Sequence, residues 1–393
     1  MKKFLKIAMS VALLGGVLLI TPQHAAAVSP KYSAWVSING NDGSAGSGKS
    51  CTKPDYNHLQ DALDDASDGW VIYLCAGTYR PADDEDNYFE IYNDVTIVGA
   101  SRTLSRIAGN CATGDGTIRG YGYDLTLKNL TVSGGCIQDS DTNYDGGGAV
   151  ALTDDGDFTC NNVTFSNNFA YTSGGAVWAD QVNLNKCSFS ANRAAFGGAV
   201  YAYGSISDKS STFNGNIAYV DGGAVYSYDG GTFEGSVFSA NGAGFYTEGW
   251  GGAIFAYQYY GNDLVIKGAK FTGNQAYYGG AVAAYDESDS GSAVRTFRTV
   301  FTSNNACYGG GVDALGSAFD TASAFTNNEA WSGCGVGGGF YIEETISLSA
   351  TKFTGNIGDN YTQMWYTASC DWADVHYTKL KHDSSQDWNW DCI

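Results

Sequence analysis

The sequence predicts an all-β parallel β-helix, a solenoid whose coils stack short strands on those of the next coil. Eight Phe-x-x-Asn units recur at intervals of 24 to 33 residues, and Gly-Gly units followed by apolar residues alternate with them. A repeat of roughly 20–50 residues marks a solenoid or an array. The repeats are rich in Gly, Ser, Thr, Tyr, Phe and Val, which favours strands over helices. About 25 residues per coil suit three short strands, whereas a propeller blade needs about 40–45.

The composition excludes several other classes of protein. The chain has 393 residues, of which 44% are apolar, enough to build a core, and 53 are glycine without the period of collagen. Only 16% are charged, so charged amphipathic helices cannot dominate. The net charge of −20 argues against nucleic acid or an anionic membrane as a partner, because binding phosphate requires Lys and Arg.

Residues 1–27 have the pattern of a secretory signal peptide. Lys2, Lys3 and Lys6 precede an apolar run at residues 7–20, and an Ala-Ala-Ala cleavage site ends at Ala27. The run is shorter than the roughly 20 apolar residues that a helix needs to cross a bilayer, and no later apolar stretch is long enough to do so. We therefore expect a secreted or cell-surface protein that does not span the membrane.

Residues 28–128 are predicted to form an N-terminal cap and the first coils. An amphipathic stretch at residues 58–66 predicts a short helix, and apolar strands follow at residues 70–74 and 95–99. A solenoid needs such a cap, since its terminal coil exposes both core and strand edges. At the other end, residues 361–393 lack the repeat and carry four tryptophans, so we expect a C-terminal aromatic cap there.

Residues 129–360 contain the repeats. The Phe-x-x-Asn units begin at Phe165, Phe189, Phe213, Phe238, Phe271, Phe301, Phe325 and Phe353. The clearest Gly-Gly units begin at Gly174, Gly197, Gly222, Gly251 and Gly279, with variants at Gly147, Gly309 and Gly337. Equivalent residues of successive coils lie about 4.8 Å apart. We therefore expect the phenylalanines to stack inside the coil and the asparagines to form an amide ladder.

These paired motifs resemble the repeats of the chlamydial polymorphic outer membrane proteins, a family of adhesin-like autotransporters. The resemblance covers residues 146–356 and implies a single-stranded right-handed parallel β-helix. The residues before the repeats resemble the start of a pectate-lyase-like β-helix. The sequence ends at Ile393 without the run of alternating strands of that family's autotransporter barrel, so the resemblance concerns the repeat region.

Ten cysteines, all after the signal segment, predict five disulfides in an oxidising compartment. Neighbouring cysteines are separated by about one coil, which brings their Cα atoms within the range that a disulfide tolerates. The expected pairs are Cys51–Cys75, Cys111–Cys136, Cys160–Cys187, Cys307–Cys334 and Cys370–Cys392.

Two columns of aromatic side chains are predicted on the outer face of the strands that follow Gly-Gly. With a two-residue strand period, one column holds Trp178, Tyr201, Tyr226 and Phe255, and the other holds Tyr203, Tyr228, Tyr257 and Tyr285. We expect these eight rings to be at least partly exposed and to bind a ligand. The alternative is that they only stabilise the fold by stacking between strands.

Acidic residues supply candidates for other chemistry. Asp313 and Glu343 are expected on the outer face of adjacent coils, about 7–8 Å apart, which suits the acid pair of an inverting glycosidase. Asp154, Asp155 and Asp157 form an acidic turn of the kind that holds Ca²⁺, or that simply lies in solvent. No other cofactor is predicted.

The hypothesis that these features favour is an adhesin-like binding module for extracellular carbohydrate or for a host or neighbouring protein surface. One alternative is a polysaccharide lyase or glycoside hydrolase, as the pectate-lyase-like resemblance implies. A structural protein of an envelope or matrix is also compatible with the sequence.

Overall fold

The computed structural model describes residues 32–39, 50–81, 87–138, 146–244, 248–286, 291–331 and 336–358, and the backbone of two further strands at 364–366 and 376–378. The predicted signal peptide lies outside the described residues. So does the predicted C-terminal cap, apart from those two strands.

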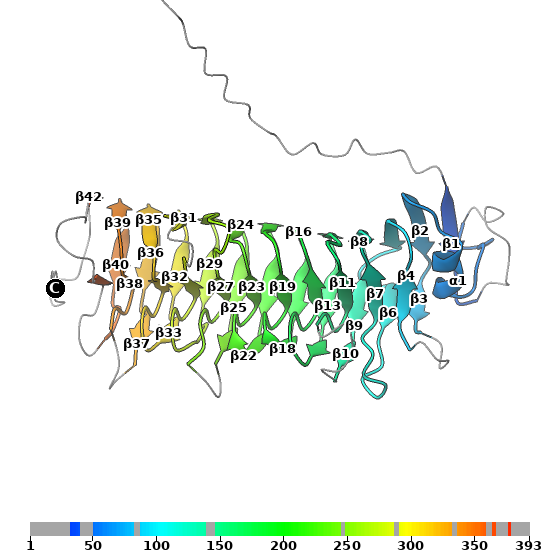
Figure 1. Cartoon of the computed structure of the whole chain (residues 1–393), viewed down its shortest axis with the longest axis horizontal. Coiled ribbons are helices and arrows are strands. Elements are labelled where there is room, and N and C mark those ends of the chain that lie inside the picture. Colours follow the sequence, from blue (N-terminus) through cyan, green and yellow to red (C-terminus); the bar gives the residue numbers. More distant parts are fainter. Residues whose placement is uncertain are drawn as a thin grey trace, which may run out of the picture.

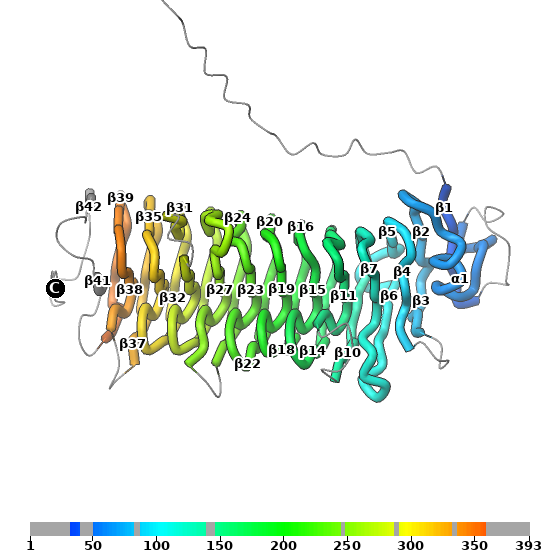
Figure 2. Tube along the Cα trace, in the orientation of Figure 1, coloured from blue at the N-terminus to red at the C-terminus, as the bar shows by residue number. Residues whose placement is uncertain are grey.

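The chain forms a right-handed parallel β-helix, an elongated stack of coils (Figures 1 and 2). Each central coil passes through three long parallel sheets in turn. The Val sheet contains the residues that follow Gly-Gly, and the Phe sheet contains the phenylalanines of Phe-x-x-Asn. The long sheet, which has the most strands, lies between them along the chain. A short corner sheet follows the Phe sheet in five coils. Every pairing between the strands of these sheets is parallel, as a β-helix requires.

The strands of the Val sheet are β4 Phe89–Ile91, β7 Ile118–Tyr121, β11 Val150–Thr153, β15 Val177–Ala179, β19 Val200–Ala202, β23 Val225–Ser227, β27 Ile254–Ala256, β30 Val282–Ala284, β34 Val312–Ala314, β38 Phe340–Ile342 and β41 Met364–Tyr366. Those of the Phe sheet are β3 Gly77–Tyr79, β6 Ser105–Ala108, β9 Thr131–Ser133, β13 Thr164–Ser166, β17 Ser188–Ser190, β21 Thr212–Asn214, β25 Val237–Ser239, β29 Lys270–Thr272, β32 Val300–Thr302, β36 Ala324–Thr326 and β40 Lys352–Thr354.

The strands of the long sheet are β1 Ser33–Val36, β2 Trp70–Leu74, β5 Val95–Gly99, β8 Leu125–Lys128, β12 Phe158–Asn161, β16 Val182–Asn185, β20 Ile206–Lys209, β24 Gly231–Glu234, β28 Leu264–Lys267, β31 Ala293–Phe297, β35 Ser317–Thr321, β39 Ile346–Ser349 and β42 His376–Thr378. The corner sheet consists of β10 Cys136–Ile137, β14 Phe169–Ala170, β18 Arg193–Phe196, β22 Ile217–Asp221 and β26 Gly242–Ala243, and a separate pair joins β33 Asn305–Ala306 to β37 Glu329–Ala330.

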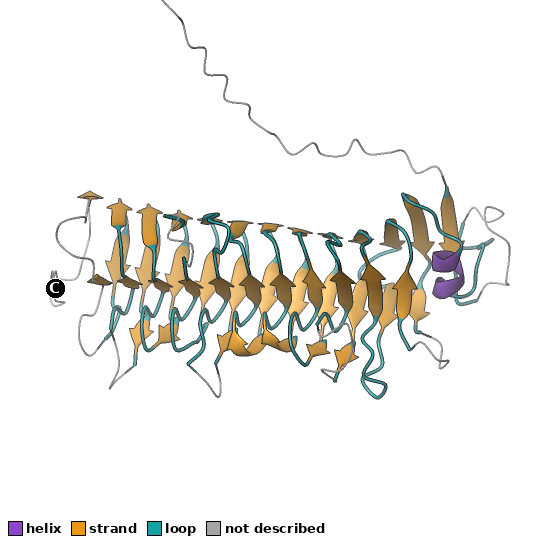
Figure 3. Cartoon of the chain, viewed as in Figure 1, coloured by secondary structure: helices purple, strands orange, loops and turns teal. Residues whose placement is uncertain are grey.

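A short helix, α1 (Leu59–Asp64), lies at the N-terminal end of the stack, where the sequence predicts a capping helix (Figure 3). Its buried side chains are Leu59, Ala62 and Leu63, which belong to the same hydrophobic cluster as the strands. The helix contacts β1 and β4. It therefore covers apolar side chains that the first coil would otherwise expose to water.

The predicted phenylalanine column and asparagine ladder are both confirmed. The eight phenylalanines are at most 1% exposed, and the centroids of successive rings lie 4.5 to 5.1 Å apart. The ladder runs from Asn168 to Asn356. In each asparagine except the last, Nδ2 donates a hydrogen bond to the Oδ1 of the equivalent asparagine in the next coil, with N–O distances of 2.9 to 3.0 Å. The same Oδ1 accepts the preceding asparagine's backbone N–H, so the ladder fixes the register between coils.

The Gly-Gly pair is needed because the chain turns tightly there against the neighbouring coil. Gly197 has a φ of 60°, a left-handed conformation that glycine adopts without a steric penalty. A Cβ on Gly198 would lie 2.2 Å from the carbonyl oxygen of Gly223 in the next coil. The first glycine therefore permits the turn, and the second permits the close approach of two coils.

Three of the five predicted disulfides lie within the described residues, and all three are confirmed. The Cα atoms are 5.5 Å apart in Cys51–Cys75, 4.7 Å in Cys111–Cys136 and 6.4 Å in Cys160–Cys187. Cys307 is also disulfide-bonded, but Cys334, its predicted partner, lies outside the described residues. The predicted Cys370–Cys392 pair lies outside them as well.

Two acidic side chains, Asp208 and Asp320, point into the core of the long sheet. Asp208 is 2% exposed and pairs in register with Leu184 and Phe233, which are both buried. One carboxylate oxygen accepts a hydrogen bond from Ser236, while the other has no hydrogen-bond partner in the described part of the chain. Burial raises the pKa of Asp208 to about 6, against an ordinary value of 3.8.

The ladder predicts that Asn216→Ala destabilises the fold. The substitution removes the Oδ1 that accepts both the backbone N–H and the Nδ2 of Asn192, and it removes one of the two donors to the Oδ1 of Asn241. Each buried polar group left unpaired costs about 1–3 kcal/mol. Urea denaturation should show this loss for Asn216→Ala, whereas the exposed control Asn214→Ala should change the unfolding free energy by less than about 0.5 kcal/mol. Equal midpoints for the two variants would contradict the role of the ladder.

Asp208 predicts a pH dependence of stability. Between about pH 4 and 6 the folded chain holds a proton on Asp208 that the unfolded chain has released, so the unfolding free energy falls as the pH rises through this window. Asp208→Asn should remove this contribution to the fall, while Asp221, whose pKa burial also raises to about 6, keeps contributing in the same window. The stability difference between the variant and the wild type should therefore change by about 3 kcal/mol from pH 4 to pH 7. Parallel stability curves for the two proteins over this range would show that Asp208 is not responsible.

Candidate functional site

The outer face of the Val sheet carries the two predicted aromatic columns. Trp178, Tyr201, Tyr226 and Phe255 pair in register on β15, β19, β23 and β27. The rings of the second column also lie beside one another: the centroids are 5.2 Å apart for Tyr203–Tyr228, 5.1 Å for Tyr228–Tyr257 and 5.5 Å for Tyr257–Tyr285. The residues that alternate with these rings, such as Val200 and Ala202, belong to the main core, whereas most rings of both columns belong to a separate cluster. The predicted outward register is therefore confirmed for both columns.

A third aromatic column, which the sequence analysis missed, lies next to the first. Its members stand immediately before four of the Gly-Gly pairs, namely Phe196, Trp250, Tyr278 and Tyr308, while Asp221 takes this position in the coil between Phe196 and Trp250. The centroids of Trp250 and Tyr278 are 4.1 Å apart, and those of Tyr278 and Tyr308 are 5.2 Å apart. An aromatic residue directly before the Gly-Gly pair is the sequence signal that could have revealed this column.

The third column corrects one expectation about exposure. Tyr226 is only 9% exposed and Phe255 only 5%, although both were predicted to be available to a ligand. Phe196 packs against the edge of Tyr226, and Trp250 packs beside Phe255. The flanking columns thus bury the middle of the aromatic surface, and these two rings contribute to packing.

The stacking also limits what the more exposed rings can do. Tyr201 lies nearly parallel to Tyr226, with an interplanar angle of 15°, and Tyr203 lies nearly parallel to Tyr228, with an angle of 5°. Each such ring therefore presents a face to its neighbour and its edge to solvent. A face that remains free for another flat molecule is found where a column ends.

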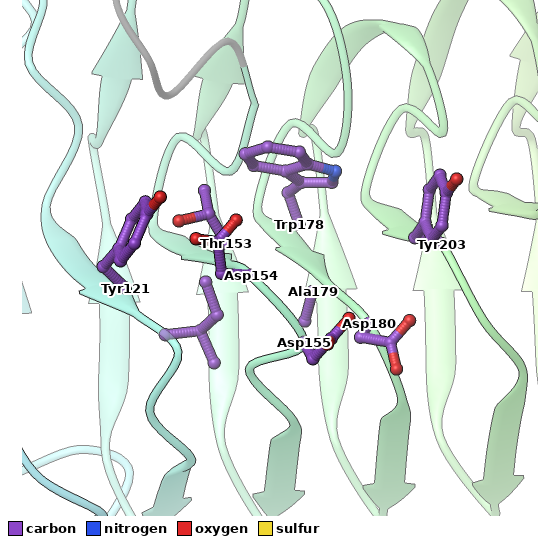
Figure 4. A pocket seen from close by; sticks show the side chains of 9 residues that line it. Tyr121, Thr153, Asp154, Asp155, Trp178, Ala179, Asp180 and Tyr203 are labelled. Carbon is purple, nitrogen blue, oxygen red and sulfur yellow. The ribbon is translucent and has the colours of Figure 1, made fainter.

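The tyrosine column has such an end beside a cavity. Going towards the N-terminus from Tyr203, the equivalent positions hold Asp180 and Thr153 in place of rings, and then Tyr121, which pairs in register with Thr153. A cavity of about 500 Å³ occupies this interruption. Figure 4 shows Tyr121 and Tyr203 at its two ends, with Trp178 between them. We call this cavity the ladder gap.

The ladder gap combines aromatic rings with carboxylates. Tyr121 and Tyr203 are 58% and 51% exposed, and Trp178 is half-buried. Asp154 and Asp155 reach the gap from the turn after β11, where both adopt left-handed φ angles of 51° and 64°. Asp180 follows β15 on the next coil and also lines the gap.

A hydroxyl group without a partner lies at the base of the ladder gap. Thr153 is 8% exposed, and its Oγ1 has no hydrogen-bond partner among the residues that the structure describes. A buried hydroxyl group without a hydrogen bond is unfavourable. A ligand hydroxyl in the gap would satisfy it.

The three candidate Ca²⁺ ligands do not face one common site. Asp154 and Asp155 line the ladder gap, but Asp157 lies outside the gap lining, and its Oδ1 accepts the backbone N–H of Gln181 at 3.1 Å. The backbone N–H of Asp157 in turn donates to Asp124, so its carboxylate is one step of a ladder along a corner of the coil. Within the described ranges, no group of three or more His, Cys, Asp or Glu side chains is arranged to hold a metal ion.

Asp313 and Glu343 interact, but they do not form an open acid pair. The negative charge of Glu343 adds to the effect of burial in raising the pKa of Asp313, and Glu343 accepts a hydrogen bond from Tyr341. Asp313, however, is fully buried, and neither of its oxygens has a hydrogen-bond partner in the described residues. A polymer lying on this face would not touch the Asp313 carboxyl, so the open arrangement that an inverting glycosidase requires is absent at this position.

Comparisons with known proteins match two of the repeats to a family model. Residues 162–180 and 210–228 match the repeat of the Chlamydia polymorphic membrane protein family. No curated protein matches the chain. Within the described part of the chain, no helix is both long enough and apolar enough to cross a membrane.

Among solved structures, the chain is similar to a pectate lyase, Pel9A, with a TM-score of 0.40 and 14% identity over 88% of this chain and 79% of that one. It is also similar to the pectin methylesterase PemA from Erwinia chrysanthemi, with a TM-score of 0.33 and 13% identity over 89% and 90% of the two chains. A third is the A-module of the mannuronan C-5 epimerase AlgE6 from Azotobacter vinelandii, with a TM-score of 0.29 and 13% identity over 83% and 94%.

Proposed function

We propose that the protein is a surface or secreted binding module that takes carbohydrate in the ladder gap. The observation that supports this most is the interruption of the tyrosine column between Tyr121 and Tyr203. The face of Tyr203 that does not stack on Tyr228 suits the apolar C–H face of a sugar, and aromatic side chains are the usual anchors of binding sites.

The size of the gap suits a short segment of glycan. Tyr121 and Tyr203 belong to coils three steps apart, which corresponds to about 14 Å along the solenoid. A sugar ring in van der Waals contact with Tyr203 would lie about 4 Å from it, and a second sugar ring would lie on the Tyr121 side of the gap. The remaining space accommodates the linkage between two such rings, so we infer a site for about two sugar residues.

The polar groups favour a neutral or amino sugar. Asp154, Asp155 and Asp180 are acceptors for sugar hydroxyl or ammonium groups, and the Thr153 hydroxyl can both donate and accept. The nine lining residues include no Lys, Arg or His. An acidic glycan would therefore meet three carboxylates without a compensating cation.

The same lining favours binding over catalysis. A lyase needs a basic side chain to remove a proton, and none lines the gap. A glycosidase needs one carboxyl that stays protonated, which burial usually provides, whereas Asp154 and Asp155 are exposed. An adhesin-like role agrees with the predicted signal peptide and with the matched repeats, the first of which includes Trp178 and Asp180.

The proposal predicts that rings bordering the gap matter for binding and rings inside the column do not. The wild type is screened against neutral, amino and acidic oligosaccharides, and the best ligand is titrated by calorimetry. Trp178→Ala and Tyr203→Ala should each weaken binding at least about tenfold, since anchor residues contribute more than 1 kcal/mol.

Tyr257→Ala is the matched control, because Tyr257 lies inside the second column, between Tyr228 and Tyr285. It should bind within about twofold of the wild type, with circular dichroism confirming that each variant is folded. A screen without any ligand, or a loss of binding in Tyr257→Ala that exceeds the loss in Tyr203→Ala, would refute the proposed site.

A further inference from the structure

A cluster of basic residues interrupts the acidic surface of the solenoid on another side. Between Ser210 and Ala350 the chain has four basic residues, Lys267, Lys270, Arg295 and Arg298, all within two successive coils. Arg295 forms an ion pair with Asp263. The other three form no ion pair within the described residues. In a chain with 41 acidic and 21 basic residues, such a local concentration of unpaired positive charge attracts an anionic partner.

Two of these basic residues, Lys267 and Arg298, line a hollow at the corner between the long sheet and the Phe sheet. Between these sheets, successive coils turn through one left-handed residue, and this position holds Lys186, Ser210, Gly235, Gly268, Arg298 and Ala322 in successive coils. The two adjacent glycines lack side chains, and a Cβ on Gly268 would meet nothing within 4 Å. A hollow of about 580 Å³ results, lined by these glycines and by Glu234, Lys267, Phe297, Arg298 and Thr321. We call it the corner notch.

Exposed apolar side chains lie in and beside the corner notch. Phe297 and Lys267 are the last residues of neighbouring strands of the long sheet and pair in register. Phe297 is 38% exposed. Val237 and Val300 flank Lys270 in register on the Phe sheet, and each is 37% exposed. The surface therefore offers both positive charge and apolar area, a combination that is common at the centre of protein interfaces, where Arg and Phe are enriched.

We propose that the corner notch is a second binding site, which docks an acidic segment of a partner protein. A carboxylate of that segment lies between Lys267 and Arg298, and an adjacent apolar side chain covers Phe297. The exposed Val237, Phe297 and Val300 favour a protein segment over an acidic polysaccharide, because a sugar chain offers no aliphatic side chain to cover them. Glu234, at the other end of the notch, repels a ligand that is acidic throughout.

The site is tested with fluorescent ten-residue peptides by polarisation. One peptide alternates Glu with Leu, and a second alternates Glu with Ser at the same net charge. The Glu/Leu peptide should bind the wild type at least fivefold more tightly than the Glu/Ser peptide. The double variant Lys267→Gln/Arg298→Gln should weaken Glu/Leu binding at least tenfold. Lys186→Gln/Lys352→Gln makes the same change of charge on coils that do not line the notch and should leave binding within twofold.

A variant that keeps every charge separates the shape of the notch from its electrostatics. Gly268→Asn fills the hollow, and asparagine adopts this left-handed turn at Asn129 and Asn162, so the variant should fold. It should weaken Glu/Leu binding at least fivefold while the melting temperature stays close to that of the wild type. Equal binding of the two peptides, no binding of either, preferential binding of chondroitin sulfate, or equal losses in both double-glutamine variants would each overturn the proposal.

Discussion

The structure depends on the in-register stacking of equivalent residues between coils. The asparagine ladder provides it, because each Oδ1 accepts two hydrogen bonds from the preceding asparagine, one from Nδ2 and one from the backbone N–H. A shift by one residue would break the buried amide ladder and turn each phenylalanine away from the core. The same register brings cysteines of consecutive coils close enough to form disulfides. The polar ladder and the apolar column thus enforce the same alignment.

This alignment also governs the surface. When successive coils carry rings at one position, as at Tyr201 and Tyr226, the rings stack and use their faces on each other. Recognition of a flat ligand is then favoured where the repetition stops. The ladder gap arises because Thr153 and Asp180 replace tyrosines, and the corner notch arises because Gly235 and Gly268 replace residues with side chains. In a solenoid of this kind, departures from the repeat are therefore the places to look for binding sites.

The repeat made the fold predictable from sequence. The spacing of Phe213 and Asn216 from their equivalents gave the coil length, the inward register and, with the cysteine spacing, the disulfides that the structure describes. The exposure of individual rings was less accessible, because it depends on neighbours across the sheet. Tyr226 is covered by Phe196 of the preceding coil. Phe196 stands before Gly197-Gly198, outside the strand to which the two-residue period was applied. Asp313 was placed on the correct face, but its burial follows from packing that strand alternation does not encode.

The most direct test of the account is a crystal structure of the protein with the oligosaccharide that binds it best. The account predicts sugar density in the gap between Tyr121 and Tyr203, with a sugar ring against the free face of Tyr203 and hydroxyl groups within hydrogen-bond distance of Thr153 and Asp180. Sugar density that instead follows Tyr228, Tyr257 and Tyr285, or that lies on another sheet, would contradict the claim that interruptions of the stacked columns create the binding site.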